Sequence, residues 1–170
     1  MHLIGTKKIW EWFDMGEKNK LSTRLGLERD VQTIVQFQEN LASETEDKSL
    51  SQESLRKGVR ALFTDHNLGF YLVCEVDNVV VGSLMVTFEW SDWRNQMFWW
   101  IQSVYVKKEY RRKGVFSELY SHVIDRAREA GNICGIRLYV ERDNIAAQKT
   151  YSQLGMQESK YLMYEFDLMS

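Results

Sequence analysis

The sequence predicts an α/β fold in which helices flank a mixed, twisted and mostly antiparallel β-sheet. Three β-rich runs follow one another through short polar turns, which is typical of an antiparallel meander. A run with helical periodicity then separates the meander from a further β-rich run, as in a parallel connection. Other helical runs precede the meander and follow that last strand.

One strand and two helices are predicted before the meander. Residues 21–27 alternate apolar and polar side chains, as a half-buried strand does, and residues 29–41 repeat apolar side chains at helical spacing. A second helix starts at Ser51, because serine is a favoured N-cap, and ends before Asn67 and Gly69. The order at this end of the chain is therefore strand, helix, helix.

The meander itself has clear turn signals. Strands at residues 70–76 and 79–90 are joined by the dipeptide Asp77-Asn78, and both residues tolerate a positive φ angle, so a tight hairpin is expected. The polar turn 91–96 then leads to the third strand of the meander, at residues 97–106.

Helix and strand alternate in the rest of the chain. A helix is predicted over residues 115–130, followed by a strand at 135–141 that runs parallel to the strand before it. Asn144 is expected to cap a short helix. The last run, KYLMYEFDL at residues 160–168, alternates and predicts a closing strand.

Composition indicates one soluble globular domain. The chain has 170 residues and is 44% hydrophobic, which suffices for one core but not for two comfortable domains. We therefore predict a single domain over residues 21–170, preceded by an extension, residues 1–20, of unknown role. That extension has no continuous apolar stretch, so neither a signal peptide nor a membrane span is expected.

Charge and cysteine content exclude several classes of function. The formal net charge is -2, so neither nucleic acid nor an anionic membrane is an expected partner. Cys74 and Cys134 lie in apolar stretches without partners at metal-ligand spacing, so no metal is expected. A reducing, cytoplasmic location is the simplest interpretation.

A basic loop joins the third meander strand to the next helix. Arg111, Arg112 and Lys113 precede Gly114, which lets the backbone approach a bulky ligand because it has no Cβ. A strand that enters a helix through such a loop aims backbone N–H groups and the positive end of the helix dipole at one spot. This pattern predicts an anion site suited to a diphosphate. The alternative is a solvated basic turn, and the loop matches neither the Walker pattern nor the dinucleotide fingerprint.

Two motifs carry a resemblance to a known family. Residues 111–116, RRKGVF, match the loop pattern Gln/Arg-x-x-Gly-x-Gly/Ala except that Phe116 replaces the last small residue. Residues 141–156 match the block Asn-x-x-Ala-x-x-x-Tyr-x-x-x-Gly-Met/Phe. Together they resemble the GNAT superfamily of acyl-CoA-dependent N-acetyltransferases, over about residues 21–168. The resemblance implies a GNAT-type sheet that splays between its fourth and fifth strands.

The same resemblance implies acetyl-CoA as cosubstrate and a homodimer. Because neither motif contains a cysteine, acetyl transfer is expected to be direct. The resemblance makes Tyr151 the acid that protonates the departing thiolate, and it places Gln102 where the diamine and thialysine branch often has a carboxylate. The residues that it assigns to acetyl-CoA are Val104, Tyr105, Val106, Arg111, Arg112, Lys113, Gly114, Val115, Phe116, Ser117 and Asn144.

The sequence leaves the general base open. Glutamine cannot take a proton, but Gln102 could orient a water that passes the proton to Glu89, Asp92, Glu141 or His66. Spacing singles out none of these four residues, and plain surface or turn roles are the alternative.

Aromatic and acidic residues near the third meander strand are candidates for the acceptor side. One face of this strand is expected to meet a helix. The other face, together with Trp90 and Trp93 of the preceding turn, forms either core or an aromatic wall that binds an amine. The acidic residues 44–47 either attract a cationic amine or form a solvated linker. Alternation assigns Phe98, Trp100, Gln102 and Val104 to one face and Trp99, Ile101, Ser103 and Tyr105 to the other.

The predicted acceptor is a primary amine of a small molecule, either polyamine-like or amino-acid-like. One alternative is a non-catalytic acyl-CoA-binding regulatory module, which the missing carboxylate at Gln102 favours and Tyr151 argues against. Another alternative is an acetyltransferase that acts on a protein amine, for which an open acidic groove would be expected.

Overall fold

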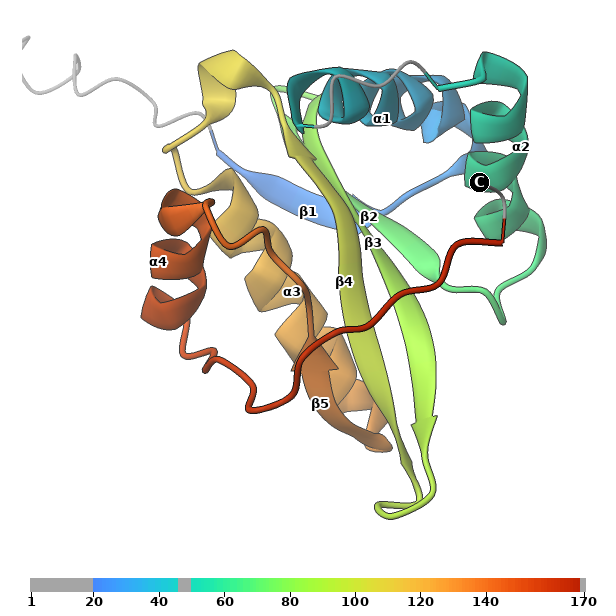
Figure 1. The fold of residues 1–170 in the computed structure, drawn as a ribbon. Coiled ribbons are helices and arrows are strands. Elements are labelled where there is room, and N and C mark those ends of the chain that lie inside the picture. Colours follow the sequence, from blue (N-terminus) through green and yellow to red (C-terminus); the bar gives the residue numbers. More distant parts are fainter. Residues whose placement is uncertain (1–19, 46–49, 169–170) are drawn as a thin grey trace, which may run out of the picture. The chain divides into compact units, whose positions relative to one another are not determined.

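The computed structural model describes residues 20–45 and 50–168 of the chain (Figure 1). It divides into two compact units, residues 1–137 and residues 138–170. The first unit holds the sheet and three of the α-helices, and the second holds helix α4 (Ile145–Gln153). The predicted N-terminal extension, residues 1–20, lies outside the described residues except for Lys20.

A five-stranded sheet forms the centre of the first unit, in the order β1-β2-β3-β4-β5 (Figure 1). The first four strands are antiparallel neighbours, whereas β5 runs parallel to β4. The mixed, mostly antiparallel sheet that the sequence predicts is thus confirmed. The strands are β1 (Ser22–Leu25), β2 (Phe70–Val76), β3 (Val79–Ser91), β4 (Gln96–Val106) and β5 (Ile133–Arg137).

Helices cover both faces of this sheet (Figure 1). On one face, Ile34 of α1 and Val59 of α2 pack with Tyr71 and Val73 of β2 in the main core cluster. Helix α3 packs on the opposite face and buries Leu119. The helices of this unit are α1 (Val31–Thr45), α2 (Gln52–Thr64) and α3 (Val115–Ala130), with 3-10 turns η2 (Glu28–Asp30) and η3 (Lys108–Tyr110) before α1 and α3.

Local capping and turn signals were predicted correctly. Ser51 caps α2, because its hydroxyl oxygen accepts a hydrogen bond from the Ser54 N–H at 3.4 Å. Asp77 and Asn78 have φ angles of 51° and 63°, as a two-residue hairpin turn of type I′ requires. Such signals depend on a few neighbouring residues, which is why the sequence alone reveals them.

A buried ion cluster fixes the start of α1 against the edge of the sheet. Arg24 of β1 donates to Asp30 at 2.6 Å and also to Glu75 of β2. Asp30 accepts a further hydrogen bond from the Leu27 N–H at 2.8 Å. Burial raises the pKa of Asp30, but the hydrogen bonds from Arg24 and Leu27 outweigh it, so that the net shift is downward. No local sequence pattern indicates this cluster, because Glu75 lies 51 residues from Arg24.

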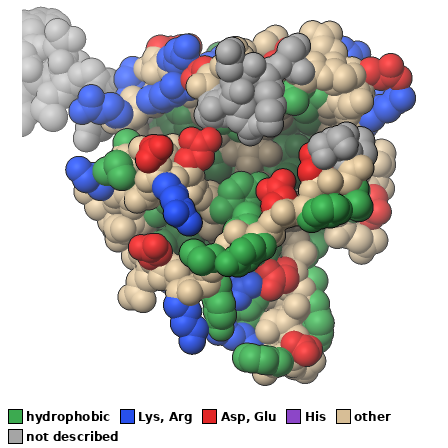
Figure 2. Space-filling view, in the orientation of Figure 1, with side chains coloured by type: hydrophobic (Ala, Val, Ile, Leu, Met, Phe, Trp, Pro, Cys, Tyr) green, Lys and Arg blue, Asp and Glu red, His purple; other side chains and the backbone are tan. Residues whose placement is uncertain are grey.

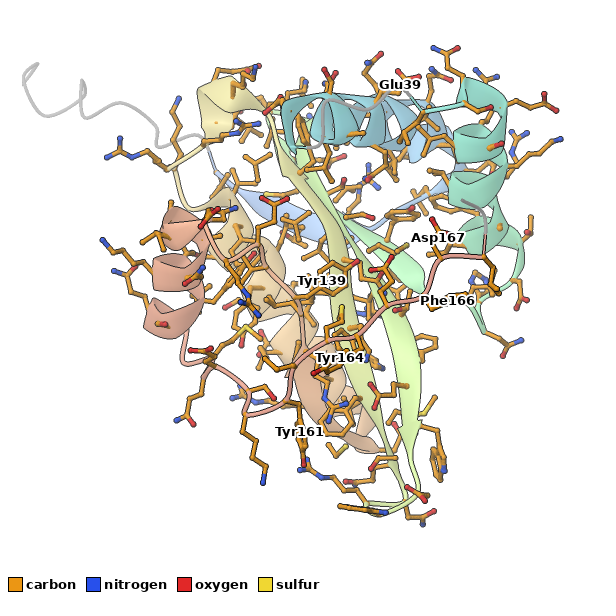
Figure 3. All side chains as sticks on the ribbon, viewed as in Figure 1. Glu39, Tyr139, Tyr161, Tyr164, Phe166 and Asp167 are labelled. Atoms are coloured by element: carbon orange, nitrogen blue, oxygen red, sulfur yellow. The ribbon has the colours of Figure 1, made fainter. Side chains whose placement is uncertain are left out.

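The chain end differs from the predicted closing strand. Within residues 138–168 no strand ladder forms, and residues 160–168 have no regular secondary structure. Six of their side chains are between 60% and 89% exposed, and Figure 3 shows three of them, Tyr161, Tyr164 and Phe166. Alternation describes which side chains could share a face, but a strand also needs a partner for its backbone groups. The predicted strand at 135–141 is likewise shorter, since β5 ends at Arg137.

Candidate active site

Strands β4 and β5 separate at a fork. Their parallel ladder runs from Met97, paired with Ile133, to Trp100, paired with Arg137. Strand β4 continues to Val106, so its outer edge from residue 101 onward has no ladder partner in the part of the chain that the structure describes. The predicted splay between the fourth and fifth strands is therefore present.

A bulge lies in the open part of β4. The ladder with β3 passes from Gln102 paired with Met85 directly to Tyr105 paired with Ser83, and Ser103 has a positive φ angle of 51°. The Gln38 side chain donates to the Ser103 carbonyl oxygen at 3.4 Å, which ties the bulge to α1. The bulge redirects the backbone at the point where strand pairing with β5 has ended.

The bulge also changes which face Tyr105 occupies. Strict alternation predicted that Tyr105 lies with Trp99, but the extra residue moves it to the face that α1 covers. Its ring lies 4.9 Å from the ring of Phe37. The prediction for Tyr105 was therefore wrong, because alternation cannot show where a strand bulges.

The loop after β4 leads into a helix start that has no side-chain cap. Gly114 has a φ angle of 84°, in the left-handed region that glycine adopts readily, and Arg112 has a φ angle of 61°. Gly114 supplies no side-chain cap to α3, whose first helical hydrogen bond runs from the Glu118 N–H to the Gly114 oxygen at 3.0 Å. The N–H groups of Val115 and Ser117 thus begin the helix without an intrahelical acceptor, which makes this helix start suited to an anion.

Phe116 departs from the family loop pattern without filling the loop. Its ring packs against the ring of Tyr120 one turn later in α3, at 6.1 Å between centroids. This contact holds the large side chain along the helix. Backbone groups at the start of α3 can then face a ligand although the residue is not small.

Arg111 braces the loop internally. Its Nε donates to the Val106 carbonyl oxygen at 2.9 Å, and its Nη2 lies 2.6 Å from Glu44 of α1. Lys108 also approaches Glu44, at 3.6 Å. The hydrogen bond from Arg111 holds the pKa of Glu44 below its ordinary value. Glu44 belongs to the acidic residues 44–47, which were predicted either to attract a cationic amine or to form a solvated linker. Its pairing with Arg111 was not predicted, because 67 residues separate the partners.

The other cations of the loop are exposed. Arg112 and Lys113 lie on the surface, and the Lys113 ammonium lies 5.4 Å from the centre of the Tyr110 ring. Figure 2 shows Lys and Arg side chains gathered at the upper left, where Figure 1 draws the loop between β4 and α3. This placement leaves positive charge available at the uncapped helix start.

Gln102 lies on the sheet face that α1 and α2 partly cover. Its amide nitrogen donates to the Thr87 hydroxyl at 2.5 Å. Glu89, one of the candidates for the general base, lies two strand positions beyond Thr87 on the same face. Its carboxylate accepts from Trp100 and from Arg137, so both oxygens have donors.

The remaining candidates for the general base are distributed over the chain. Asp92 accepts from the Trp93 N–H at 2.8 Å within the β3–β4 turn. His66 is exposed after α2, and Glu141 is exposed in the second unit. Of the four candidates, Glu89 is the one that shares a sheet face with Gln102.

The register places Trp90 on the sheet face of Trp99 and Ile101, one of the two faces considered for the aromatic wall. Trp90 pairs with Met97 and therefore lies on the face opposite to Phe98 and Trp100. Trp93 is almost fully exposed in the β3–β4 turn. The aromatic residues that share the face of Gln102 are Phe98 and Trp100.

Two predicted site residues belong to the second unit. The Asn144 side chain accepts from the Ala147 N–H at 3.1 Å, which confirms it as the cap of α4. Tyr151 of α4 is half-buried, and burial raises the pKa of its hydroxyl above the ordinary value of about 10. A neutral tyrosine hydroxyl is the form that can donate a proton.

Two other features, a membrane-spanning helix and a metal-binding cluster, are absent from residues 20–45 and 50–168. In that part of the chain no helix is long and apolar enough to span a membrane. The same residues contain no group of three or more His, Cys, Asp or Glu side chains placed to hold a metal ion.

Comparisons with known proteins agree with this geometry. The model of the Acetyltransferase (GNAT) family matches residues 34–156. A structure described as a possible acetyltransferase from Clostridium difficile 630 is 48% identical in sequence, with a TM-score of 0.81, and the alignment covers 88% of this chain and 99% of that chain. No curated protein sequence matches the chain significantly.

More distant solved structures share the fold. A predicted acetyltransferase from Clostridium acetobutylicum, solved with acetyl-CoA, is 17% identical, has a TM-score of 0.72 and aligns over 88% of this chain and 97% of its own. A ribosomal-protein-alanine N-acetyltransferase from Brucella melitensis biovar Abortus 2308 is also 17% identical, with a TM-score of 0.72, over 88% of this chain and 99% of its own. At this level of identity they support the fold alone.

Proposed function

The chain belongs to the GNAT family of acetyltransferases, and from that premise we propose that it transfers an acetyl group directly from acetyl-CoA to a primary amine of a small molecule. As a family member it is an acyl-CoA-dependent N-acetyltransferase. The acceptor, the direct route and the roles of single residues are parts of the proposal. So are a cytoplasmic location and a homodimer, which rest on the sequence and its resemblance.

One observation carries the proposal: the open edge of β4 leads straight into an uncapped helix start. Within the described residues, the outer edge of β4 from Ile101 to Val106 has no strand partner, and Gly114, the N-cap of α3, follows Val106 by eight residues. An extended pantetheine arm needs backbone partners, and the diphosphate that follows it needs N–H donors. Both kinds of partner occur here in the order in which the cosubstrate presents its groups.

The loop and the open edge divide the binding of acetyl-CoA between them. Backbone groups of residues 104–106 bind the pantetheine arm, and residues 112–117 bind the diphosphate through N–H groups and two cations. Arg111 acts here through its contacts with Val106 and Glu44, so it shapes the loop. The family resemblance adds Asn144, the N-cap of α4, to the proposed acetyl-CoA-binding residues.

Acetyl transfer requires a new bond and two proton movements. The amine nitrogen attacks the thioester carbonyl carbon, so that a C–N bond forms and the C–S bond breaks. A backbone N–H near Val104 stabilises the negative charge that develops on the carbonyl oxygen, a kind of contact worth about 3 kcal/mol in other enzymes. The Tyr151 hydroxyl gives its proton to the departing thiolate. The ammonium proton passes to a water that Gln102 orients and from there to bulk solvent.

Thiol release from acetyl-CoA, measured across a panel of amines, tests the proposal. The panel contains polyamines, thialysine, amino acids and peptides, and Tyr151→Phe is measured beside the natural protein. We expect turnover with one class of small amine and a large fall in kcat in the variant, since general acids contribute roughly 100-fold or more. Tight binding of acetyl-CoA without turnover on any amine would instead establish a regulatory acyl-CoA-binding module.

A further inference from the structure

Arg137 stands at the fork where β5 leaves β4. It is the last residue of β5, and it pairs with Trp100 at the end of the parallel ladder. The open edge of β4 begins at the next residue, Ile101. Arg137 therefore lies where the two strands diverge, and both strands belong to the first unit.

Three neighbours hold the Arg137 guanidinium in one orientation. Its Nη1 lies 2.6 Å from a Glu89 oxygen, and its central carbon lies 3.6 Å from the centre of the Phe98 ring and 5.8 Å from that of Trp100. The second Glu89 oxygen accepts from the Trp100 indole N–H, so the carboxylate is fixed as well. A guanidinium stacked on a ring and anchored by a carboxylate has little rotational freedom left.

The backbone of β5 makes room for this arrangement. A Cβ atom at Gly135 would lie 2.7 Å from the Phe98 ring, closer than side chains normally approach. Glycine at this position lets the ring lie against the strand. The ring then forms the platform on which Arg137, two residues later, is stacked.

Within the described residues, most hydrogen-bond donors of Arg137 have no protein acceptor. A guanidinium group has five N–H donors, and within the described residues the one hydrogen bond of this side chain goes to Glu89. The side chain is 36% exposed. Because its orientation is already fixed, its remaining donors can bind an anion without a further loss of rotational freedom.

A second cation lies at the same ring. The guanidinium carbon of Arg94, in the β3–β4 turn, lies 4.8 Å from the centre of the Phe98 ring, and its Nη1 is 3.5 Å from the Cys134 carbonyl oxygen. Two guanidinium groups thus lie against the Phe98 ring, and the carboxylate of Glu89 is bound to one of them. The cluster carries an excess positive charge, which attracts an anion and repels a polyamine.

We propose that Arg137, assisted by Arg94, binds an oxyanion of the acceptor, so that the acceptor is amino-acid-like and carries a carboxylate or phosphate besides its amine. The inference rests on the proposed acetyl transfer and chooses between its two acceptor classes. This anion site is distinct from the loop at residues 112–117, because Trp100 pairs with Thr87 and Val106 with Gly82, so that five positions of β3, or about 17 Å, separate it from the end of β4. The acceptor amine and its anion therefore occupy separate ends of an elongated molecule.

Matched acceptors that differ only in the distal group provide the test. A series of ω-amino carboxylates of increasing chain length is compared with their amides, with ω-aminoalkyl phosphates and with diamines, using thiol release from acetyl-CoA. The proteins are the natural chain, Arg137→Gln, Arg94→Gln and Arg128→Gln. Arg128 is an exposed cation of α3 and serves as the matched control. Melting temperatures show whether each variant is folded.

We expect the natural protein to prefer an anionic acceptor of one chain length over its amide and over the diamine. Arg137→Gln should raise the KM for that acceptor by about 10- to 100-fold, with little change for the amide and for acetyl-CoA, because a charge-assisted bond is lost. Arg94→Gln, at an exposed position, should raise the KM by a smaller factor. The carboxylate and phosphate series then identify which oxyanion is bound.

Two results would overturn the inference. One is an equal or better rate with amides or diamines, and the other is an equal effect of Arg137→Gln on all acceptors. If no amine is acetylated, the proposed transfer fails and binding decides the inference alone. The Trp100 indole N–H signal, assigned with Trp100→Phe, is then followed by NMR in the presence of coenzyme A. A shift with the carboxylates or phosphates that Arg137→Gln abolishes would support the anion site, and no shift would refute it.

Discussion

Arg111 of the loop after β4 lies 2.6 Å from Glu44 near the end of α1. The same arginine donates to the carbonyl oxygen of Val106, the last residue of β4. Tyr105 joins the cluster, since its hydroxyl donates to Glu44 at 3.2 Å and its ring lies 5.6 Å from the Arg111 guanidinium. The position of the loop is thereby linked to α1 as well as to the strand that precedes it.

We predict that Glu44→Gln weakens acetyl-CoA binding without changing the chemical step. The variant removes the carboxylate that orients Arg111, so the loop loses one of its two anchors and the KM for acetyl-CoA should rise about 3- to 10-fold while kcat stays the same. Steady-state kinetics at low ionic strength measure both constants. Glu109→Gln is the matched control, because Glu109 is exposed in η3 of the same loop. A lowered kcat with an unchanged KM would show that the pairing does not position the loop.

Gly114 offers a second test of the loop. Its φ angle of 84° is unfavourable for any residue with a Cβ. Space is not the obstacle, because a Cβ atom here would lie 3.8 Å from the Leu21 side chain, an ordinary contact distance. Gly114→Ala should therefore cost about 1 to 2 kcal/mol of unfolding free energy through backbone conformation alone. It should also weaken acetyl-CoA binding, because the N–H groups at the start of α3 are displaced.

Gly58→Ala is a control that should change the stability in the opposite direction. Gly58 lies in the exposed part of α2, and a Cβ there meets nothing within 4 Å. Alanine in a helix interior should stabilise the protein by about 0.5 to 1 kcal/mol. Chemical denaturation of both variants measures whether Gly114→Ala lowers and Gly58→Ala raises the free energy of unfolding. A stable Gly114→Ala protein with natural affinity for acetyl-CoA would contradict the requirement for glycine.

The sequence was informative where structure depends on neighbouring residues. The turn at Asp77 and Asn78, the cap at Ser51 and the glycine at Gly114 each follow from the conformational preference of one or two residues, and all three are present. The family motifs then supplied the splay of the sheet, which no local preference could have indicated. The fold was thus predictable from short-range signals together with a resemblance.

Long-range relationships were not predictable in the same way. The bulge at Ser103 depends on how β4 registers against β3, so alternation assigned Tyr105 to the wrong face. The contacts of Arg111 with Glu44 and of Arg137 with Glu89 join residues far apart in the chain. Residues 160–168 have the alternation of a strand, yet alternation does not supply a partner for pairing.

The cluster of Arg24, Asp30 and Glu75 predicts a pH-dependent contribution to stability. Because the pKa of Asp30 is lowered in the folded protein, its carboxylate stabilises the fold above its unfolded pKa of about 4. That contribution is lost as the pH falls through the lower, folded value. Asp30→Asn should cost about 2 kcal/mol at neutral pH, less than for a fully buried pair because Arg24 is partly exposed.

Urea denaturation at neutral pH and at progressively lower pH measures this difference. The difference in unfolding free energy between the natural protein and Asp30→Asn should narrow as the pH falls below about 4, since Asp30 of the unfolded chain then binds a proton and Asp30 of the folded protein does so only at lower pH. Asp125→Asn, which affects an exposed pair with Arg128 on α3, should change stability by less than about 0.5 kcal/mol at any of these pH values. A gap that stays constant with pH would show that the charge of Asp30 contributes nothing.

The pH dependence of turnover tests the role of Tyr151. Burial raises the pKa of its hydroxyl above about 10, so a general acid at this position keeps its proton throughout the neutral and mildly alkaline range. With saturating acceptor, kcat should rise as the amine loses its proton and should not fall again below about pH 10. Tyr151→Phe should lower kcat roughly 100-fold at every pH while the KM for acetyl-CoA stays within a few-fold.

Tyr161→Phe is the matched control. It removes a tyrosine hydroxyl from an exposed residue and should leave kcat unchanged. A kcat in Tyr151→Phe equal to that of Tyr161→Phe would assign the proton to another donor, such as water.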